Sequence, residues 1–333
     1  MERGYIKPLD QCSLADVSTV GGKCASLGEL ERAGLPGSPG FAVTVKTYRD
    51  FVVRTGIEER IREVLQKALD ASAGDGGVPF HELEAAIDEV FQGVQLSVEA
   101  RASIVDSYRA LCDRCGCDDV LVAVRSSATS EDSDQSSFAG QHETFLNVCG
   151  EDEVVEKTMA CWKSLFSAAA LHYRTSADMD HLEAQMAVAV QKMVDAKVSG
   201  VMFTVNPITN DANQMVIEMA WGLGEGVVSG YVAPDNYVVD KRTFAIVERM
   251  ISPKMVEFVR DVESGGTIMR DVEEERQSIP CMTDDEVIEL ARMGMTIETY
   301  YGKPMDIEWA VDSQLPWPEA LVTLQSRPIT TLR

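Results

Sequence analysis

The sequence predicts a protein of the α+β class, because helix-like and strand-like segments both recur along the chain. Apolar residues recur with helical spacing between residues 57 and 117, which predicts three helices over 57–72, 81–92 and 97–115. From residue 186 onward, short apolar or alternating segments predict strands beginning near 186, 197, 215, 235 and 245. A further helix is expected over 151–176 and an exposed acidic loop over 261–280.

Bulk composition is that of a globular protein with one large domain or two modest ones. The chain has 333 residues, of which 45% are hydrophobic and 25% charged. Its net charge of -24 argues against a nucleic-acid partner, because phosphate backbones require clustered cations. No run of about 18 apolar residues occurs, so no membrane partner is expected. The N-terminus lacks an apolar signal core, which leads us to expect a cytoplasmic protein.

The stretch from Val120 to Gln141 is the most informative part of the chain. Five apolar residues, Val120–Val124, predict a buried strand, and Arg125 lies where the sequence changes to small hydroxyl residues. A strand end at this point would direct the guanidinium into a cleft. Small residues allow backbone N–H groups to approach an anion, and arginine offers a planar fork to phosphate. The alternative is a strand followed by a solvated serine-rich turn.

A second candidate anion site lies at Lys23. This lysine follows the pair Gly21-Gly22 and opens a helical pattern that ends at Gly34 and Pro36. Free N–H groups at a helix N-terminus beside an ammonium group suit a phosphate. The Walker A spacing is absent. An ordinary surface lysine is the alternative interpretation.

The end of the chain predicts a metal-binding hairpin. Two strands, about 304–312 and 321–328, are joined by a loop with prolines, so that Glu308 and Gln325 could face the same side. Two oxygen ligands together with phosphates suit Mg²⁺, which takes few protein ligands. The alternative is that both residues are the exposed face of a hairpin. Before this hairpin, Thr283 is expected to cap a helix over 284–301.

Cysteines and glycines give weaker signals. Cys112, Cys115 and Cys117 lie close together but lack a second Cys-x-x-Cys pair, which favours free thiols over a structural metal and leaves metal binding open. The glycine-rich turn after Met215–Trp221 does not have the dinucleotide-binding spacing.

Six motifs, in this order, resemble the N-terminal nucleotide-binding domain of phosphoenolpyruvate synthase and pyruvate phosphate dikinase. Rifampin phosphotransferase and the ATP-binding subunit of phenylphosphate synthase share this domain. The resemblance covers about residues 4–333. The motifs are Gly21-Gly-Lys-Cys-Ala-Ser-Leu-Gly28, Val124-Arg-Ser-Ser-Ala-Thr-Ser-Glu-Asp132, Ser137-Phe-Ala-Gly-Gln141, Ser199-Gly-Val-Met-Phe-Thr204, Asp306-Ile-Glu308 and Leu324-Gln-Ser-Arg-Pro-Ile-Thr330.

The resemblance implies an ATP-grasp fold of two α+β subdomains, 1–190 and 191–333, that clamp ATP. It assigns the phosphates to Lys23, Arg125 and Arg327, which also form the implied catalytic set. The implied phosphate cover comprises Phe138, Ala139, Gly140 and Gln141. Gln191, Met193 and Val194 are implied to line the adenine, and Glu218 to contact adenine or ribose. Glu308 and Gln325 are implied to hold Mg²⁺. Cys24 departs from the family, whose members often carry asparagine there.

The resemblance also implies an acceptor outside this chain. Family members carry a swivelling domain with a catalytic histidine in a Thr-Ser-His type motif, and none of the four histidines here lies in such a motif: His81, His142, His172 and His181. We therefore expect an ATP-dependent phosphotransferase component of the pyruvate, water dikinase type, whose partner chain or domain carries the phosphohistidine and the acceptor-substrate site.

Three alternatives remain open. One is the ATP-binding subunit of a phenylphosphate-synthase-like or antibiotic phosphotransferase. The second is a non-catalytic nucleotide-binding regulatory module, which has less need of the implied metal pair Glu308 and Gln325. A self-contained ATP-grasp ligase would need an acyl-acceptor pocket, of which the sequence gives no sign.

Overall fold

The polypeptide forms two units, each built on its own antiparallel sheet, as the computed structural model shows. Unit 1 comprises Met1–Ala25 and Pro39–Lys192, and unit 2 comprises Ser26–Ser38 and Met193–Arg333. The mixture of helices with antiparallel sheets confirms the α+β class. The structure describes residues 4–72, 78–129, 132–133, 136–137, 143–261 and 265–329.

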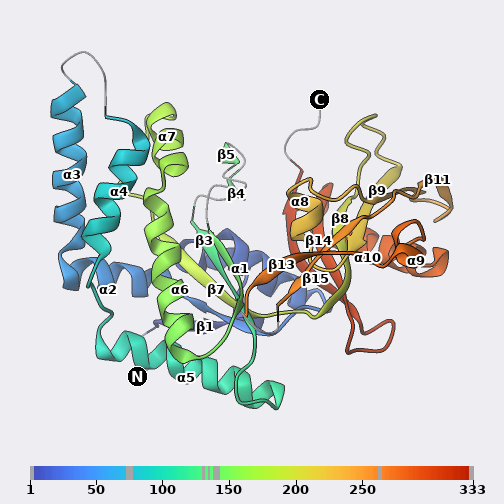
Figure 1. Ribbon diagram of the computed structural model, residues 1–333, viewed down its shortest axis with the longest axis horizontal. Coiled ribbons are helices and arrows are strands. Elements are labelled where there is room, and N and C mark those ends of the chain that lie inside the picture. The colour runs from blue at the N-terminus through green and yellow to red at the C-terminus, as the bar shows by residue number, and fades with distance from the viewer. Residues whose placement is uncertain are drawn as a thin grey trace. The chain divides into compact units, whose positions relative to one another are not determined.

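Unit 1 has a five-stranded sheet in the order β1-β2-β7-β3-β6, in which all neighbours are antiparallel. Helices α5 and α6 pack on this sheet, and α3, α4 and α7 extend the helical layer (Figure 1). The strands are β1 (Ile6–Pro8), β2 (Gly40–Val43), β3 (Val122–Ala128), β6 (Thr144–Val148) and β7 (Met186–Lys192). The short strands β4 (Asp132–Ser133) and β5 (Ser136–Ser137) form a separate pair.

Three helices of unit 1, α3, α4 and α5, lie close to the predicted ranges 57–72, 81–92 and 97–115, whereas the helix predicted over 151–176 differs. They are α2 (Val45–Thr55), α3 (Ile57–Ser72), α4 (Phe80–Phe91), α5 (Val98–Cys115), α6 (Glu151–Lys163) and α7 (Ala168–Ser176), together with η1 (Leu9–Gln11), η2 (Leu14–Asp16) and η3 (Ser164–Phe166). The single helix expected over 151–176 is wrong. It breaks into α6, η3 and α7, because the hydroxyl of Ser167 accepts the N–H of Ala170 and starts a new helix.

The core of unit 1 lies between the sheet and its helices. Val122 and Val124 of β3 and Val188 and Val190 of β7 point into it, where they meet the fully buried Trp162 of α6. Side chains alternate between the two faces of a strand, so Ala123, Arg125 and Ser127 face the opposite side. That second face carries the first group of candidate site residues.

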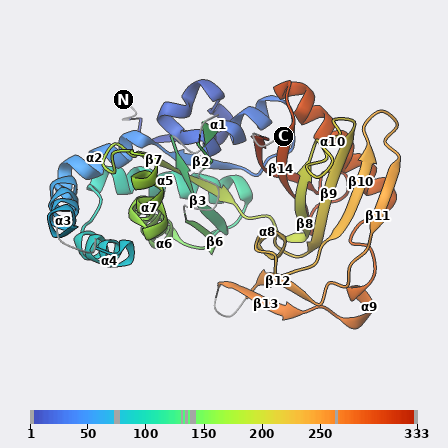
Figure 2. The same cartoon turned by 90° about the horizontal axis from the view of Figure 1, so that it is seen from above.

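Unit 2 has a six-stranded antiparallel sheet in the order β11-β10-β9-β8-β14-β15. Its strands are β8 (Ala196–Phe203), β9 (Gln214–Trp221), β10 (Asp235–Asp240), β11 (Ile246–Met250), β14 (Met305–Asp312) and β15 (Leu321–Pro328). Helix α10 (Asp284–Tyr301) covers one face (Figure 2). Its N-terminus has the predicted Thr283 cap in a capping box with Glu286. The predicted C-terminal hairpin is confirmed.

A separate hairpin, β12 (Val256–Arg260) and β13 (Thr267–Asp271), lies beside α8 (Glu225–Val228) and α9 (Glu274–Gln277) (Figure 2). The sequence predicted an exposed loop over 261–280, which is wrong. The acidic composition concealed the strand, because β13 gains its partner only through pairing with β12.

The segment Ser26–Ser38 groups with unit 2 although it lies early in the chain. Leu30 belongs to the core under α10, the hydroxyl of Ser26 donates to the Ser326 carbonyl at 2.6 Å, and Thr323 N donates to the Pro36 carbonyl at 3.0 Å. Helix α1 (Val17–Arg32) therefore contributes its first part to unit 1 and its second part to unit 2. Within the described ranges, no helix is long and apolar enough to cross a membrane.

Candidate functional site

The first group of site residues lies where α1 meets β3 in unit 1. Helix α1 is interrupted at Gly21, which has φ 74° and ψ 169°, so a new helical segment begins just before Lys23. The ammonium of Lys23 donates to the Ser126 carbonyl at 2.7 Å, and only 6% of this residue is exposed. The lysine is thus not an ordinary surface residue. Its head group is fixed against β3.

Ser127 ties the interrupted helix to the sheet. Its hydroxyl donates to the Val20 carbonyl at 2.8 Å and accepts the N–H of Cys24 at 3.1 Å. A Cβ at Gly21 would lie 1.9 Å from the Ser127 carbonyl oxygen, so only glycine allows this approach. The close approach of α1 to β3 therefore requires a glycine at position 21, a steric reason that the sequence pattern alone did not reveal.

Arg125 lies in the middle of β3. The expectation of a strand end at this residue is wrong, because β3 continues through Ala128 with Ser126 and Ser127 buried. The partly buried Arg125 stands on the same face as Ser127. In the register of β3 and β7, Ala123 pairs with Gln191, which places Gln191 on that face as well. Two predicted residues of unit 1, Arg125 and Gln191, thus lie on the side of its sheet where Ser127 bonds to α1.

Gln191 carries a further signal. It is 3% exposed, and its Nε2 is a buried donor that lacks a hydrogen-bond partner in the described structure. Buried donors are almost always satisfied, so an unsatisfied one calls for an explanation. A ligand with an acceptor atom would supply it. The predicted residues Phe138, Ala139, Gly140 and Gln141 lie outside the described residues.

The second group of site residues forms rows across the unit 2 sheet. Glu218 of β9 pairs with Val201 of β8, Val201 with Glu308 of β14, and Glu308 with Gln325 of β15. Residues directly opposite in antiparallel strands have their side chains on the same face. The neighbours of these residues along the strands, Ile217, Met202 and Ile307, belong to the core that packs on α10. The row from Glu218 to Gln325 therefore lies on the other face.

Glu308 and Gln325 are directly opposite each other, which is the arrangement that the hairpin prediction required. Their Cβ atoms are about 4.5–5.5 Å apart in such a pair. Glu308 is half-buried and Gln325 is 9% exposed. Carboxylate and amide oxygens are hard donors of the kind that Mg²⁺ prefers, so this donor pair fits the metal.

Asp306 is a site residue that the sequence analysis did not select, although it stands two positions before Glu308. Its Oδ2 accepts a hydrogen bond from Nε of Arg327 at 2.8 Å and forms an ion pair with Nη2 of Arg327 at 2.7 Å, and the two residues pair in register. Burial raises the pKa of Asp306, and the Arg327 guanidinium opposes that shift. Asp306 and Glu308 stand two residues apart on β14, and this spacing could have shown from the sequence that both lie on one face. Arg327 is therefore held in a fixed orientation on the face of Glu308.

An apolar cluster adjoins the polar rows. Val194 packs with Ala310 and Val322, and Leu324 lies against them. Ala310 stands two residues from Glu308 on β14, so this cluster occupies the same face. Val194 is 7% exposed and Met193 is half-buried. The face thus offers an apolar region for a flat ring beside oxygen donors and a fixed cation.

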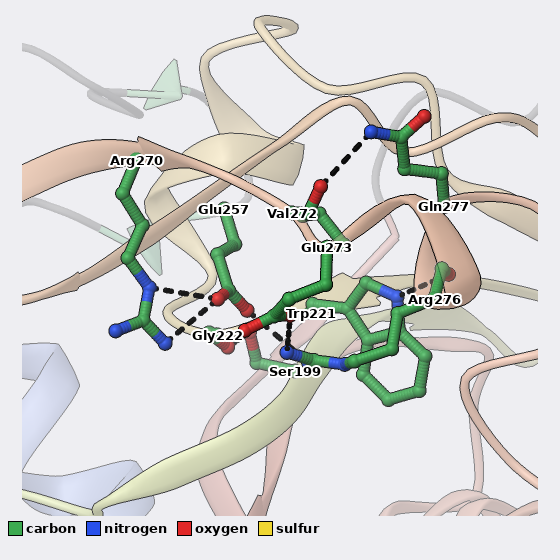
Figure 3. A network of polar contacts seen from close by, with 9 residues as sticks. All are labelled: Ser199, Trp221, Gly222, Glu257, Arg270, Val272, Glu273, Arg276 and Gln277. Carbon is green, nitrogen blue, oxygen red and sulfur yellow. Dashed lines mark hydrogen bonds and ion pairs between the residues drawn. The ribbon is translucent and has the colours of Figure 1, made fainter.

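A polar network fixes the glycine turn that follows β9. The hydroxyl of Ser199 donates to the Gly222 carbonyl at 2.6 Å, and the guanidinium of Arg276 lies 4.6 Å from the centre of the Trp221 ring. The carboxylate of Glu257, 2% exposed, binds both Arg276 and Arg270 (Figure 3). The hairpin β12–β13 is thereby attached to the end of β9, which holds the backbone near Glu218 in place.

The remaining candidates lie apart from these groups. Cys112 is buried, Cys115 half-buried and Cys117 exposed, and all three are free thiols. In the described part of the chain, no three histidines, cysteines or acids are grouped as metal ligands. His172 stacks edge-on with Phe80, and His181 accepts from Arg174.

Comparison with known proteins decides the family. The model of the family described as "Pyruvate phosphate dikinase, AMP/ATP-binding domain" matches residues 17–333. The chain belongs to this family. The resemblance inferred from the six motifs is therefore confirmed.

Phosphoenolpyruvate synthases are among the relatives of this AMP/ATP-binding domain. The chain is 45% identical over 329 residues to a probable phosphoenolpyruvate synthase of Methanocaldococcus jannaschii, covering 99% of this chain and 27% of that protein. It is 43% identical to a probable phosphoenolpyruvate synthase of Methanothermobacter thermautotrophicus, covering 98% and 46%. It is 41% identical to the phosphoenolpyruvate synthase of Pyrococcus furiosus, covering 99% of this chain and 44% of that protein. The chain thus spans less than half the length of these relatives.

Proposed function

We propose that this chain is the ATP-binding part of a phosphoenolpyruvate-synthase-like phosphotransferase. It transfers a phosphoryl group from ATP to a histidine outside this chain, with AMP and phosphate as the overall products. The family match over residues 17–333 carries the proposal, and the row that places Glu308 opposite Gln325 supports it.

In the proposed site, Lys23 and Arg125 bind the phosphates from unit 1. Arg125 belongs to β3, and the ammonium of Lys23 is held against the same strand by the Ser126 carbonyl. Gln191 donates its unsatisfied N–H to a ring nitrogen of adenine. Met193 and Val194 pack against the base. The loop Phe138–Gln141 covers the phosphates, as the family resemblance implies.

In unit 2, Glu308 and Gln325 hold Mg²⁺, and Arg327 binds the transferred phosphate. Bound Mg²⁺ neutralises charge on the phosphates during in-line transfer. Asp306 orients Arg327 through a hydrogen bond from Nε and an ion pair with Nη2. The ATP-grasp arrangement, with both units clamping the nucleotide, is part of this proposal.

Calorimetry with MgATP tests the binding residues. Lys23→Ala or Arg125→Ala should each weaken binding by about 1.5–3 kcal/mol, the range for hydrogen bonds to a charged group. Lys46→Ala removes a half-exposed lysine of the same unit and serves as the control. Wild-type affinity in both site variants would refute the assignment.

Transfer assays test the metal pair. Glu308→Gln should abolish phosphoryl transfer while the fold is retained, because one of the two Mg²⁺ ligands loses its charge. Glu248→Gln changes an exposed acid on β11 of the same sheet and should leave transfer unchanged. An unchanged transfer rate in Glu308→Gln would show that this residue is only hairpin surface.

The acceptor is tested by adding a chain that carries the swivelling histidine domain of a relative. Alone, the present chain should bind ATP and turn it over very slowly, because the acceptor histidine is then missing and water must act as the nucleophile. With the added chain, AMP should form, and label from β-³²P-ATP should appear on that chain. Label on His81, His142, His172 or His181 would contradict the proposal.

A further inference from the structure

A groove of about 570 Å³ lies between helices α3 and α4 of unit 1. The two helices pack side by side and run in opposite directions (Figure 1, Figure 2). The floor of the groove is apolar: Val64 and Ala68 come from α3, and Leu83, Ala86 and Val90 come from α4. The small alanine side chains keep the groove open, so it can admit side chains of another element.

Charged side chains of opposite sign form the two edges of this groove. Arg60 and Lys67 stand seven residues apart on α3, and Glu82 and Glu89 stand seven residues apart on α4. All four residues are exposed, whereas the floor is buried or half-buried. Seven residues are two helical turns, about 10.5 Å, so each pair lies on one side of its helix. One edge is therefore positive and the other negative.

The charges at the edges are not engaged within the chain. Among the residues that the structure describes, none of these four side chains has an ion-pair or hydrogen-bond partner. The other two acids of α4 do have partners. Asp88 forms an ion pair with Lys163 at 3.0 Å, and Glu84 accepts the N–H of Ala168 at 3.0 Å. The acids of α4 that line the groove are thus the ones left for a partner outside the chain.

The layout of the four charges is its own complement. Arg60 stands near the start of α3 and Glu89 near the end of α4, so in antiparallel helices both lie at one end of the groove. Lys67 and Glu82 lie toward the other end. A two-fold axis parallel to the helices places α3 of one copy over α4 of a second copy. Arg60 then faces Glu89 of the second copy, and Lys67 likewise faces Glu82. A two-fold axis across the helices would instead bring like charges together.

We propose that this groove is a contact surface between two copies of the chain, which associate through α3 and α4 as an antiparallel four-helix bundle. The apolar floors meet at its centre, and each copy contributes both charges of every type at its edges. This inference does not rest on the proposed function.

The size of the surface sets the strength of the dimer. Helix α4 has 12 residues and is about 18 Å long, and two helices are about 20 Å wide, so the contact covers roughly 400 Å² of each copy. A standard interface covers about 800 Å² per partner. The net charge of -24 on each copy also opposes association. The dimer is therefore weak and reversible, and its stability depends on the charged edges.

Sedimentation velocity of the full chain at physiological ionic strength, from low micromolar to millimolar concentration, tests the inference. The wild-type chain should show a reversible equilibrium between monomer and dimer. Arg60→Glu and Glu89→Arg each create two like-charge contacts in the dimer. Each should therefore raise the dissociation constant by more than about tenfold, because such contacts are strongly unfavourable at an interface. A wild-type chain that stays monomeric over the whole range would refute the inference.

Mixing the two variants is the decisive measurement. In a mixed dimer, the reversed charge of one variant faces the reversed charge of the other, and the remaining Arg60 and Glu89 face each other. Every contact is again between opposite charges. An equimolar mixture should dimerise as the wild type does, although each variant alone stays monomeric, and this rescue also shows that both variants are folded.

The same helix offers a matched control. Arg62 is an exposed arginine of α3 that forms an ion pair with Glu58 and does not line the groove. Arg62→Glu changes the net charge by the same amount as Arg60→Glu and should leave the equilibrium unchanged. A wild-type dissociation constant for Arg60→Glu alone, or a mixture without rescue, would show that the copies associate through another surface and would refute the inference.

Discussion

Gly21→Ala tests whether the interruption of α1 is what positions Lys23. Gly21 has φ 74° and ψ 169°, a region that residues other than glycine reach only at a cost of about 1–3 kcal/mol. The added Cβ would lie 1.9 Å from the Ser127 carbonyl oxygen and 2.4 Å from its hydroxyl. Both atoms belong to β3, so α1 must shift. The bonds of the Ser127 hydroxyl to Val20 and Cys24 are then strained or lost.

Each of the two buried groups left without a partner adds about 1–3 kcal/mol, so the total loss in the free energy of unfolding should be at least about 3 kcal/mol. Gly56→Ala is the matched control. Gly56 also has a positive φ of 62°, but a Cβ there meets nothing within 4 Å. Backbone strain alone should cost about 1–2 kcal/mol. Urea denaturation measures both values, and calorimetry should show weaker ATP binding only for Gly21→Ala. Equal losses within about 1 kcal/mol would refute the steric argument.

Three other perturbations test particular parts of the structure. Lys254→Met strands the buried Asp235 carboxylate and should cost about 3–5 kcal/mol in urea denaturation, whereas Lys46→Met breaks an exposed pair and should cost less than about 1. Glu257→Gln weakens the bonds to Arg270 and Arg276 and should cost about 1.5–3 kcal/mol; an unchanged midpoint would contradict this. Burial and nearby Arg174 lower the pKa of His181, against the opposing charge of Asp180. The unfolded chain therefore binds this proton first, and the contribution of His181 to stability is lost as pH falls below about 6.5. His181→Gln should flatten the stability curve between pH 7 and 5.5, and an unchanged slope would contradict the assignment.

The sequence determined much of the local structure, because short-range signals were strong there. Thr283 with Glu286 begins α10, and the helix ends at Tyr301 as predicted. The strand 235–240 and the C-terminal hairpin follow from alternation and turn residues. The motifs also identified the family, since six of them occur in a fixed order along the chain.

Tertiary structure decided the features that depend on pairing between distant segments. The register across β9, β8, β14 and β15 brings Glu218 into the row of Glu308 and Gln325. No local pattern specifies that register, because it is fixed by packing of the opposite face on α10. Likewise, β3 continues past Arg125 because Ser127 is satisfied by α1, which lies about 100 residues away. A buried hydroxyl with a distant partner has the same local sequence as an exposed serine, and only the fold distinguishes the two.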